Sequence, residues 1–252
     1  MESLLYSFLA GSSTVLGALL VMLFGMPGKN LLSAILGFAG GIMLAISFFE
    51  LMPEALELGN MVTVILSFLF GAAIMYMLDI YIPHAHVASS NEVEVENSSG
   101  YAPLALASRE NMLRAGYLIF LGIALHNLPE GVAIGAGLES SPELGLYIAI
   151  AIGLHNIPEG VAVAGPLRFG GLTVGKVILL TFLAGLMAPV GAAIGLLFFG
   201  ISPIFVSAGL AFAAGAMVYI VNDELIPQSH ALNAHISIGG LLAGILLGFA
   251  LT

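Results

Sequence analysis

The chain has 252 residues, of which 60% are hydrophobic and only 8% are charged, and its mean hydropathy is +1.10. A soluble domain carries roughly 25% charged residues, so this composition excludes a soluble globular protein and indicates one embedded in a lipid bilayer. Only five Lys and Arg residues are present, which argues against nucleic acid as a partner. The sequence contains no Cys, so disulfides and thiolate metal sites are excluded.

Eight segments have the roughly 20 mostly apolar residues that a membrane-spanning helix needs. They cover residues 4–24, 31–55, 61–81, 112–138, 143–166, 174–199, 204–226 and 236–251. The first has no basic region before it and no A-x-A site after it, so we expect a retained helix and not a signal peptide. The prediction is an all-α integral membrane protein with a single transmembrane domain over residues 1–252.

The one long connection, residues 82–111, contains the polar and acidic stretch "ASSNEVEVENSSGYAP". Such a composition is typical of a mobile loop. The alternation in "NEVEVE" could favour a strand, but a strand without a partner would not be stable. We therefore expect a loop whose glutamates, Glu92, Glu94 and Glu96, face solvent.

The positive charges predict the orientation of the chain. Counted across eight spans, all five fall on one side of the membrane, and the positive-inside rule makes that side cytoplasmic. Both termini then lie outside, the 82–111 loop lies in the cytoplasm, and the expected location is the cell membrane. The five residues are Lys29, Arg109, Arg114, Arg168 and Lys176.

Two similar blocks, "LHNLPEGVAIG" from Leu125 and "LHNIPEGVAVA" from Leu154, place polar residues inside apolar segments. A carboxylate at bilayer depth costs about 2.5–3.5 kcal/mol, yet each block holds a Glu near the middle of its span. In each block the His and the Glu are four residues apart and share one helix face. Because a short loop joins the two segments, we expect the blocks to meet at similar depth.

The converging side chains suit a divalent cation. Two imidazoles, two carboxylates and two Asn side chains would carry a charge of about −2, and this donor set favours Zn, Fe(II), Mn or Co over Ca or Mg. Pro129 and Pro158 each leave one helix carbonyl without its usual donor, which suits an ion path. The alternative is that the polar residues only hold two helices together, but two copies of a block with an unneutralised Glu argue against it.

The two blocks resemble the signature segments of the ZIP family of divalent metal transporters, and within it those of bacterial zinc transporters. The resemblance extends through "GFAGGIMLAISFFELMPEA", "PHAH" and "AAGAMVYIVNDELIP", and so over nearly the whole chain. It implies eight helices in a 3+2+3 arrangement, with helices 1–3 and 6–8 as an inverted repeat around helices 4 and 5. It also implies import of metal into the cytoplasm and suggests a homodimer.

The resemblance implies two neighbouring metal sites. The residues of the first would be His126, Glu130, His155 and Glu159, with Met43 near them. The residues of the second would be Asn127, Glu130, Asn156 and Glu159, together with a Glu on helix 6. In this chain Ala188 of "AGLMAPVGA" stands where that Glu would be, which puts the second site in doubt.

Other polar residues are weaker candidates for the metal pathway. Glu50 and Glu54 lie four residues apart at the outer end of the second segment and could attract cations at the mouth, or serve no specific purpose. By resemblance, two clusters near the cytoplasmic side could form an exit path. Their residues are Asp79, His84 and His86 in one, and Asp223, Glu224 and His230 in the other.

Three functions compete. The leading one is a transporter of divalent metal, with zinc the first candidate beside iron, manganese and cadmium, and with the metal as substrate and not as cofactor. An intramembrane metallohydrolase would require H-E-x-x-H, which neither block has, so we expect no enzyme. A proton-coupled carrier of an organic solute would work without divalent metal.

Overall fold

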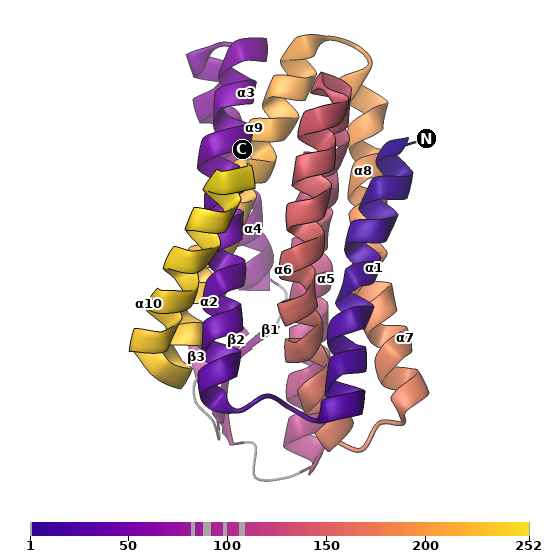
Figure 1. Cartoon of the computed structure of the whole chain (residues 1–252), viewed down its shortest axis with the longest axis vertical. Helices are drawn as coiled ribbons and strands as arrows, with labels where there is room; N and C mark the ends of the chain where they lie inside the picture. Colours follow the sequence, from indigo (N-terminus) through magenta and orange to yellow (C-terminus); the bar gives the residue numbers. More distant parts are fainter. Residues whose placement is uncertain (1, 82–83, 88–91, 98–99, 106–108, 252) are drawn as a thin grey trace.

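The computed structural model describes residues 2–81, 84–87, 92–97, 100–105 and 109–251. Long apolar helices lie roughly along one axis, and a small sheet lies at one end (Figure 1). In chain order the elements are α1 (Glu2–Phe24), α2 (Lys29–Ala45), the π-helical turn η1 (Ile46–Leu51), α3 (Met52–Leu58), α4 (Met61–Tyr81), β1 (His84–Val87), β2 (Glu92–Asn97), β3 (Gly100–Ala105), α5 (Arg109–Ser140), α6 (Pro142–Phe169), α7 (Val174–Gly185), α8 (Met187–Phe199), α9 (Pro203–Ile220), the π-helical turn η2 (Val221–Leu225) and α10 (Ile226–Leu251).

Seven helices of the described chain are long and apolar enough to cross a membrane. The structure therefore agrees with the sequence prediction of a multi-pass membrane protein. The seventh helix, Pro203–Ala250, contains both of the last two predicted segments, because α9, η2 and α10 follow one another without a break in helical assignment.

That last helical stretch is interrupted at Asn233, whose φ of −167° and ψ of 103° are not helical. Ser33 on α2 donates to the carbonyl oxygens of Ser229 at 2.8 Å and of Asn233 at 2.9 Å. Ser229 and Ser237 are also hydrogen-bonded, at 2.6 Å. These side chains satisfy backbone carbonyls that the interruption leaves without helical donors.

The chain reverses its direction at this interruption. The later half of α10 packs on α2 in the parallel sense, whereas α9 packs on α2 and α3 in the antiparallel sense. The contacting pairs are Gly37 with Ser237 and Gly41 with Leu241 in the first case, and Gly59 with Ser207 and Gly40 with Leu225 in the second. The two predicted segments thus point in opposite directions, as successive membrane crossings would.

A three-stranded antiparallel sheet, in the order β1-β2-β3, occupies the connection between α4 and α5. The expectation of no strand there is wrong, because "EVEVEN" pairs with a neighbouring segment on each side, whereas the described spanning segments are all helical, as predicted. The register places His84 opposite Glu96 and His86 opposite Glu94. The expected mobile loop also includes residues 82–83, 88–91, 98–99 and 106–108, which lie outside the described residues.

The helices pack in two groups. Helices α5 and α6 pack with α1, α7 and α8, whereas α2, α3 and α4 pack with α9 and α10. The groups meet mainly where α5 contacts α9 and where α2 contacts α6. Within both groups glycines bring backbones together: Gly17 lies against the carbonyl oxygen of Ile157, and Gly71 against that of Phe212. Close approach at small residues is the usual way in which membrane helices associate.

Candidate metal site between α5 and α6

Helices α5 and α6 bring the two polar blocks together in the interior of the molecule. Each helix continues through its internal proline, Pro129 or Pro158. The side chains of Glu130 and His155 are fully buried, and Glu159 is 1% exposed. The sequence prediction that both glutamates lie deep inside spanning helices therefore agrees with where the structure places them.

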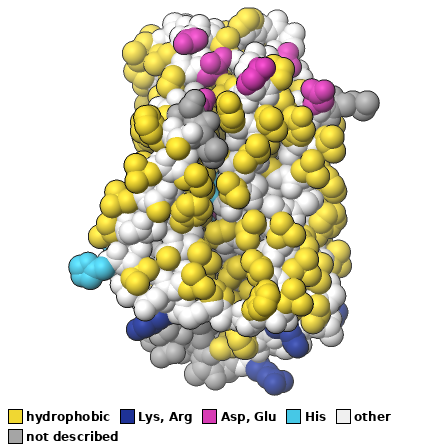
Figure 2. All heavy atoms as spheres, viewed as in Figure 1, with side chains coloured by type: hydrophobic (Ala, Val, Ile, Leu, Met, Phe, Trp, Pro, Cys, Tyr) yellow, Lys and Arg dark blue, Asp and Glu magenta, His cyan; other side chains and the backbone are white. Residues whose placement is uncertain are grey.

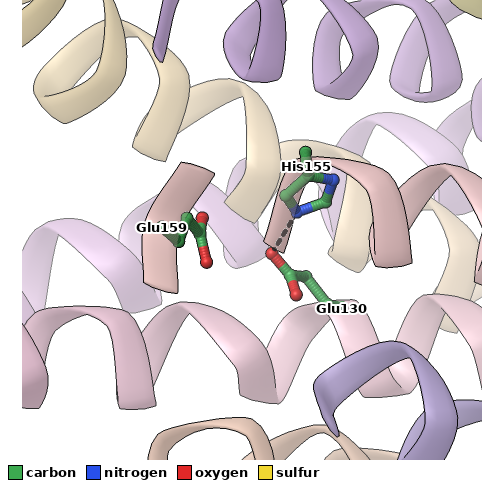
Figure 3. A group of neighbouring side chains, drawn as sticks. All are labelled: Glu130, His155 and Glu159. Atoms are coloured by element: carbon green, nitrogen blue, oxygen red, sulfur yellow. Dashed lines mark hydrogen bonds and ion pairs between the residues drawn. The ribbon is translucent and has the colours of Figure 1, made fainter. Parts of the chain in front are cut away.

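Glu130, His155 and Glu159 form a compact cluster in which one ligand atom from each residue lies within 4.8 Å of the others. His155 Nε2 is 2.8 Å from Glu130 Oε1, and the Glu159 carboxylate points toward this pair (Figure 3). One nitrogen and several carboxylate oxygens in this arrangement could coordinate Zn²⁺ or a similar ion.

Three carboxylate oxygens of this cluster have no hydrogen-bond partner among the described residues. Among the described residues, none bonds Oε2 of Glu130 or either carboxylate oxygen of Glu159, and all three atoms are buried. A buried charge is costly unless it is paired or coordinates a metal. Two adjacent carboxylates also repel each other, so the arrangement strongly favours a bound cation.

His126 is not part of this cluster and is paired with another carboxylate. Its Nε2 lies 2.9 Å from Oε2 of Glu224 on η2, and the other oxygen of Glu224 accepts a hydrogen bond from Gln228 at 3.0 Å. Asp79 on α4 and Glu130 also act on the His126 side chain electrostatically. Of the four residues that resemblance assigns to the first site, the structure therefore groups three, and the fourth is paired with Glu224.

Asn127 and Asn156 are fully buried, and their side chains donate hydrogen bonds to backbone carbonyl oxygens. Asn127 donates to the carbonyl oxygens of Ile123 at 3.0 Å and Ala184 at 3.2 Å, and Asn156 donates to that of Ala10 at 3.1 Å. Asn156 also donates to Oδ1 of Asn127 at 3.3 Å. Among the described residues, no donor bonds Oδ1 of Asn156. Of the two amide oxygens, the one on Asn156 is therefore the better placed to bind an ion.

The candidates of the outer mouth lie on η1 and α3. Glu50 is half-buried on η1, and Glu54 on α3 accepts a hydrogen bond from Ser140 at the end of α5. Met43 is fully buried in the core. Ala188, at the start of α8, is also fully buried, and its carbonyl oxygen lies against Gly131.

The exit-path candidates whose side chains are described lie on α4, η2 and α10. Asp79 is buried on α4, and Asp223 is half-buried and lines a separate surface cavity with Tyr219 and Asn222. His230 lies 3.0 Å from the hydroxyl of Ser237. His84 and His86 lie on β1, where the structure describes the backbone only.

Sequence reasoning did not find the direct pairing of Glu224 with His126, or the part of Gln228. Both residues belong to "DELIPQ", which matches "FELMPE" at Phe49–Glu54 in three of its six letters. Comparing these two stretches with each other would have shown that Glu50 and Glu224 are equivalent positions.

The fold and the site together define a class of protein: a multi-pass membrane protein with a buried site of His and Glu between two helices that contain proline. The family model described as ZIP Zinc transporter matches residues 105–252. The chain is also 39% identical over 254 residues to the zinc transporter ZupT of Escherichia coli O7:K1 (strain IAI39 / ExPEC), an alignment covering 98% of this chain and 95% of the relative. ZupT proteins of Escherichia coli O127:H6 (strain E2348/69 / EPEC) and O1:K1 / APEC match to the same extent. The chain belongs to the ZIP family.

Proposed function

We propose that this protein carries divalent metal ions, zinc first, across the cell membrane into the cytoplasm. The observation that carries the proposal is the buried cluster of Glu130, His155 and Glu159, whose three carboxylate oxygens without a hydrogen-bond partner among the described residues favour a cation. The zinc transport named for its ZupT relatives supports zinc as substrate. Iron, manganese and cadmium would suit the same donors.

A second ligand set supports movement of the ion and not only storage. The pair of His126 and Glu224 lies beside the cluster on the side where α5 begins, and Asp79 lies near it at the end of α4. An ion leaving Glu130 would meet these groups next. We therefore assign them to the path toward the cytoplasm.

We propose eight membrane crossings with both termini outside. The reversal at Asn233 supports the eighth, because α9 and the later half of α10 run in opposite directions. The orientation is supported by the five Lys and Arg, which all lie at or beyond one end of the spanning helices. The homodimer suggested by resemblance stays a prediction.

An intramembrane hydrolase is a poor fit to the same site. A metal held by both Glu130 and Glu159 would leave no carboxylate of the cluster to act as general base. Membership of a transporter family also favours transport. A carrier of an organic solute would be distinguished by uptake that does not depend on divalent metal.

The test is uptake of Zn²⁺ by purified protein in lipid vesicles that contain a zinc-sensitive dye, with and without an imposed proton gradient or membrane potential. Glu130→Gln and Glu159→Gln each remove one of the charges that hold the ion while keeping the side chain's size. We expect uptake to fall at least about tenfold in each, because hydrogen bonds and ion contacts of buried charged groups contribute more than the roughly 1.4 kcal/mol that corresponds to a factor of ten.

The matched control is Glu57→Gln, which changes an exposed carboxylate at the end of α3. Its uptake should equal that of the unmodified protein. Near-normal uptake by both site variants would refute the site, and no metal-dependent uptake by the unmodified protein would refute the function.

A further inference from the structure

A cavity of about 490 Å³ lies between α1, α2 and α6. Both α1 and α2 pack on α6, and the cavity is at the end of these helices where the connection between α1 and α2 passes (Figure 1). Its wall includes Leu20 on α1, Pro27 in the connection, Leu31 and Ile35 on α2, and Ile157 on α6. Three helices therefore leave a space that none of them fills.

The residues that line this cavity are all apolar. An apolar cavity excludes ordered water and takes up apolar groups instead. Two of the lining residues lie at the surface of the spanning helices, because Phe24 is 81% exposed and Leu31 is 58% exposed. The cavity is therefore open to the surface that faces lipid.

The size of the cavity suits a flexible chain better than a protein segment. Its volume of about 490 Å³ falls within the range of about 300–1,000 Å³ that is usual for sites of small ligands. A helix about 10 Å across takes up roughly 400 Å³ per turn, so a helix of a second copy would place only about one turn inside. A single hydrocarbon chain can bend to follow the wall.

The mouth of the cavity is positively charged. Lys29 is exposed and lies between two residues of the wall, Pro27 and Leu31. The helix α2 begins at Lys29, and its N-cap residue Gly28 provides no side-chain acceptor for the first N–H groups. Free N–H groups at a helix N-terminus favour an anion, and they add to the charge of the lysine.

A second positive charge lies nearby on α6. Met26, another residue of the wall, lies against Gly165. Arg168 is three residues further along α6 and so lies on the same face of the helix. An apolar cavity with two cationic side chains at its mouth is complementary to a molecule with an apolar tail and an anionic head.

We infer that this cavity binds an anionic phospholipid, with one acyl chain inside and the headgroup phosphate at Lys29. Basic pockets between spanning helices on the cytoplasmic side bind anionic headgroups in this way, and the orientation proposed above places this end of the molecule in the cytoplasm. The lipid joins α1, α2 and α6 where their own side chains leave space. The inference goes beyond metal transport and does not depend on which ion is carried.

The test is binding of lipid by the purified, delipidated full chain in detergent, measured by native mass spectrometry. Phosphatidylglycerol and phosphatidylcholine with identical acyl chains are titrated separately, because both carry a phosphate but only the first is anionic. We expect one tightly held phosphatidylglycerol per chain, bound at least about fivefold more tightly than phosphatidylcholine, since a Lys near the membrane surface contributes roughly this factor.

Two variants test the position of the charge. Lys29→Gln should remove most of the preference for phosphatidylglycerol. Lys176→Gln is the matched control, because Lys176 is an exposed lysine on α7, outside the wall of the cavity. Both variants lower the net charge equally, so a difference between them reports where the headgroup lies.

Two further variants test the cavity itself. Leu20→Trp puts a larger side chain into the space and should weaken binding of both lipids at least about tenfold, because each CH₂ group that loses its buried position costs about a factor of four. Leu19→Trp is the control on the same helix. Leu19 is 38% exposed and Leu20 is 44% exposed, but only Leu20 lines the cavity. Leu31→Trp replaces Leu20→Trp if thermal unfolding shows that the latter does not fold.

Three results would overturn the inference. Equal loss of preference in Lys29→Gln and Lys176→Gln would show a general attraction of anions to the basic end. Equal lipid binding by Leu20→Trp and Leu19→Trp would show that no chain enters the cavity. Displacement of bound phosphatidylglycerol by excess inorganic phosphate would show that the anion is held without its chain. Zinc uptake is not part of these measurements, so their outcome is independent of the transport function.

Discussion

At the scale of single residues, Ala188 bears most on how many ions the site can hold. Two unit charges about 4 Å apart interact by about 4 kcal/mol at an effective dielectric constant near 20, and two divalent ions repel about four times as strongly. Glu130 and Glu159 supply only two negative charges against this repulsion. Oδ1 of Asn127 already accepts a bond from Asn156, which weakens it as a ligand.

We therefore predict one tightly bound metal ion per chain, and two in Ala188→Glu, which adds a carboxylate on α8. Ala188→Gln is the control of equal size without charge and should stay at one. Metal content of the purified proteins after dialysis against Zn²⁺ gives the stoichiometry. Two tightly bound ions in the unmodified protein would show that the charge argument is wrong.

Which residues form the candidate site was readable from the sequence only in part. The spacing of His and Glu in each block placed both glutamates on α5 and α6 and predicted that the blocks meet, and the structure has them together. The partner of His126 could not be read in this way, because a shared helix face does not decide which neighbouring helix a side chain meets. The π-helical turn η2 brings Glu224 to His126, and hydropathy does not reveal such turns.

At the scale of elements, length and hydropathy predicted every long helix but not how the last two join. The reversal at Asn233 is stabilised by Ser33 on a helix distant in sequence, so no local pattern marks it. The sheet was missed for a related reason: a strand of alternating Glu and Val forms only because β1 and β3 flank it. Partners distant in the sequence decide both features.

Packing of α1 on α6 gives a prediction at this scale. A Cβ at Gly17 would collide with backbone at Ile157 and Val161, which cannot move aside as a flexible side chain would. Gly17→Ala should lower the thermal unfolding temperature in detergent, at a cost of about 1–3 kcal/mol for overpacking. Gly175→Ala is the control, because a Cβ there meets nothing within 4 Å, and it should be neutral or slightly stabilising. Equal melting temperatures for both variants would contradict the close packing.

At the scale of the whole molecule, charge is separated along the long axis. On the face that Figure 2 shows, Lys and Arg side chains lie at one end and acidic side chains gather at the other, with an apolar surface between them. The acidic end includes Glu57 near the end of α3, and the basic end includes Lys176 on α7. An apolar belt between two charged ends is the surface that a bilayer requires, and the positive-inside rule predicts that the basic end is cytoplasmic.

The orientation can be measured with single cysteines in this Cys-free chain. Glu57→Cys and Gly175→Cys place an exposed thiol at the acidic and the basic end respectively. In intact cells an impermeant thiol reagent should label Glu57→Cys and leave Gly175→Cys unlabelled, and permeabilised cells should show labelling of both. Neither substitution removes one of the five positive charges, so the topological signal itself is unchanged. Labelling of Gly175→Cys but not of Glu57→Cys in intact cells would show that the protein has the opposite orientation in the membrane. The path from the cluster through His126 and Glu224 would then lead outward, and the proposed direction of transport would have to be reversed with it.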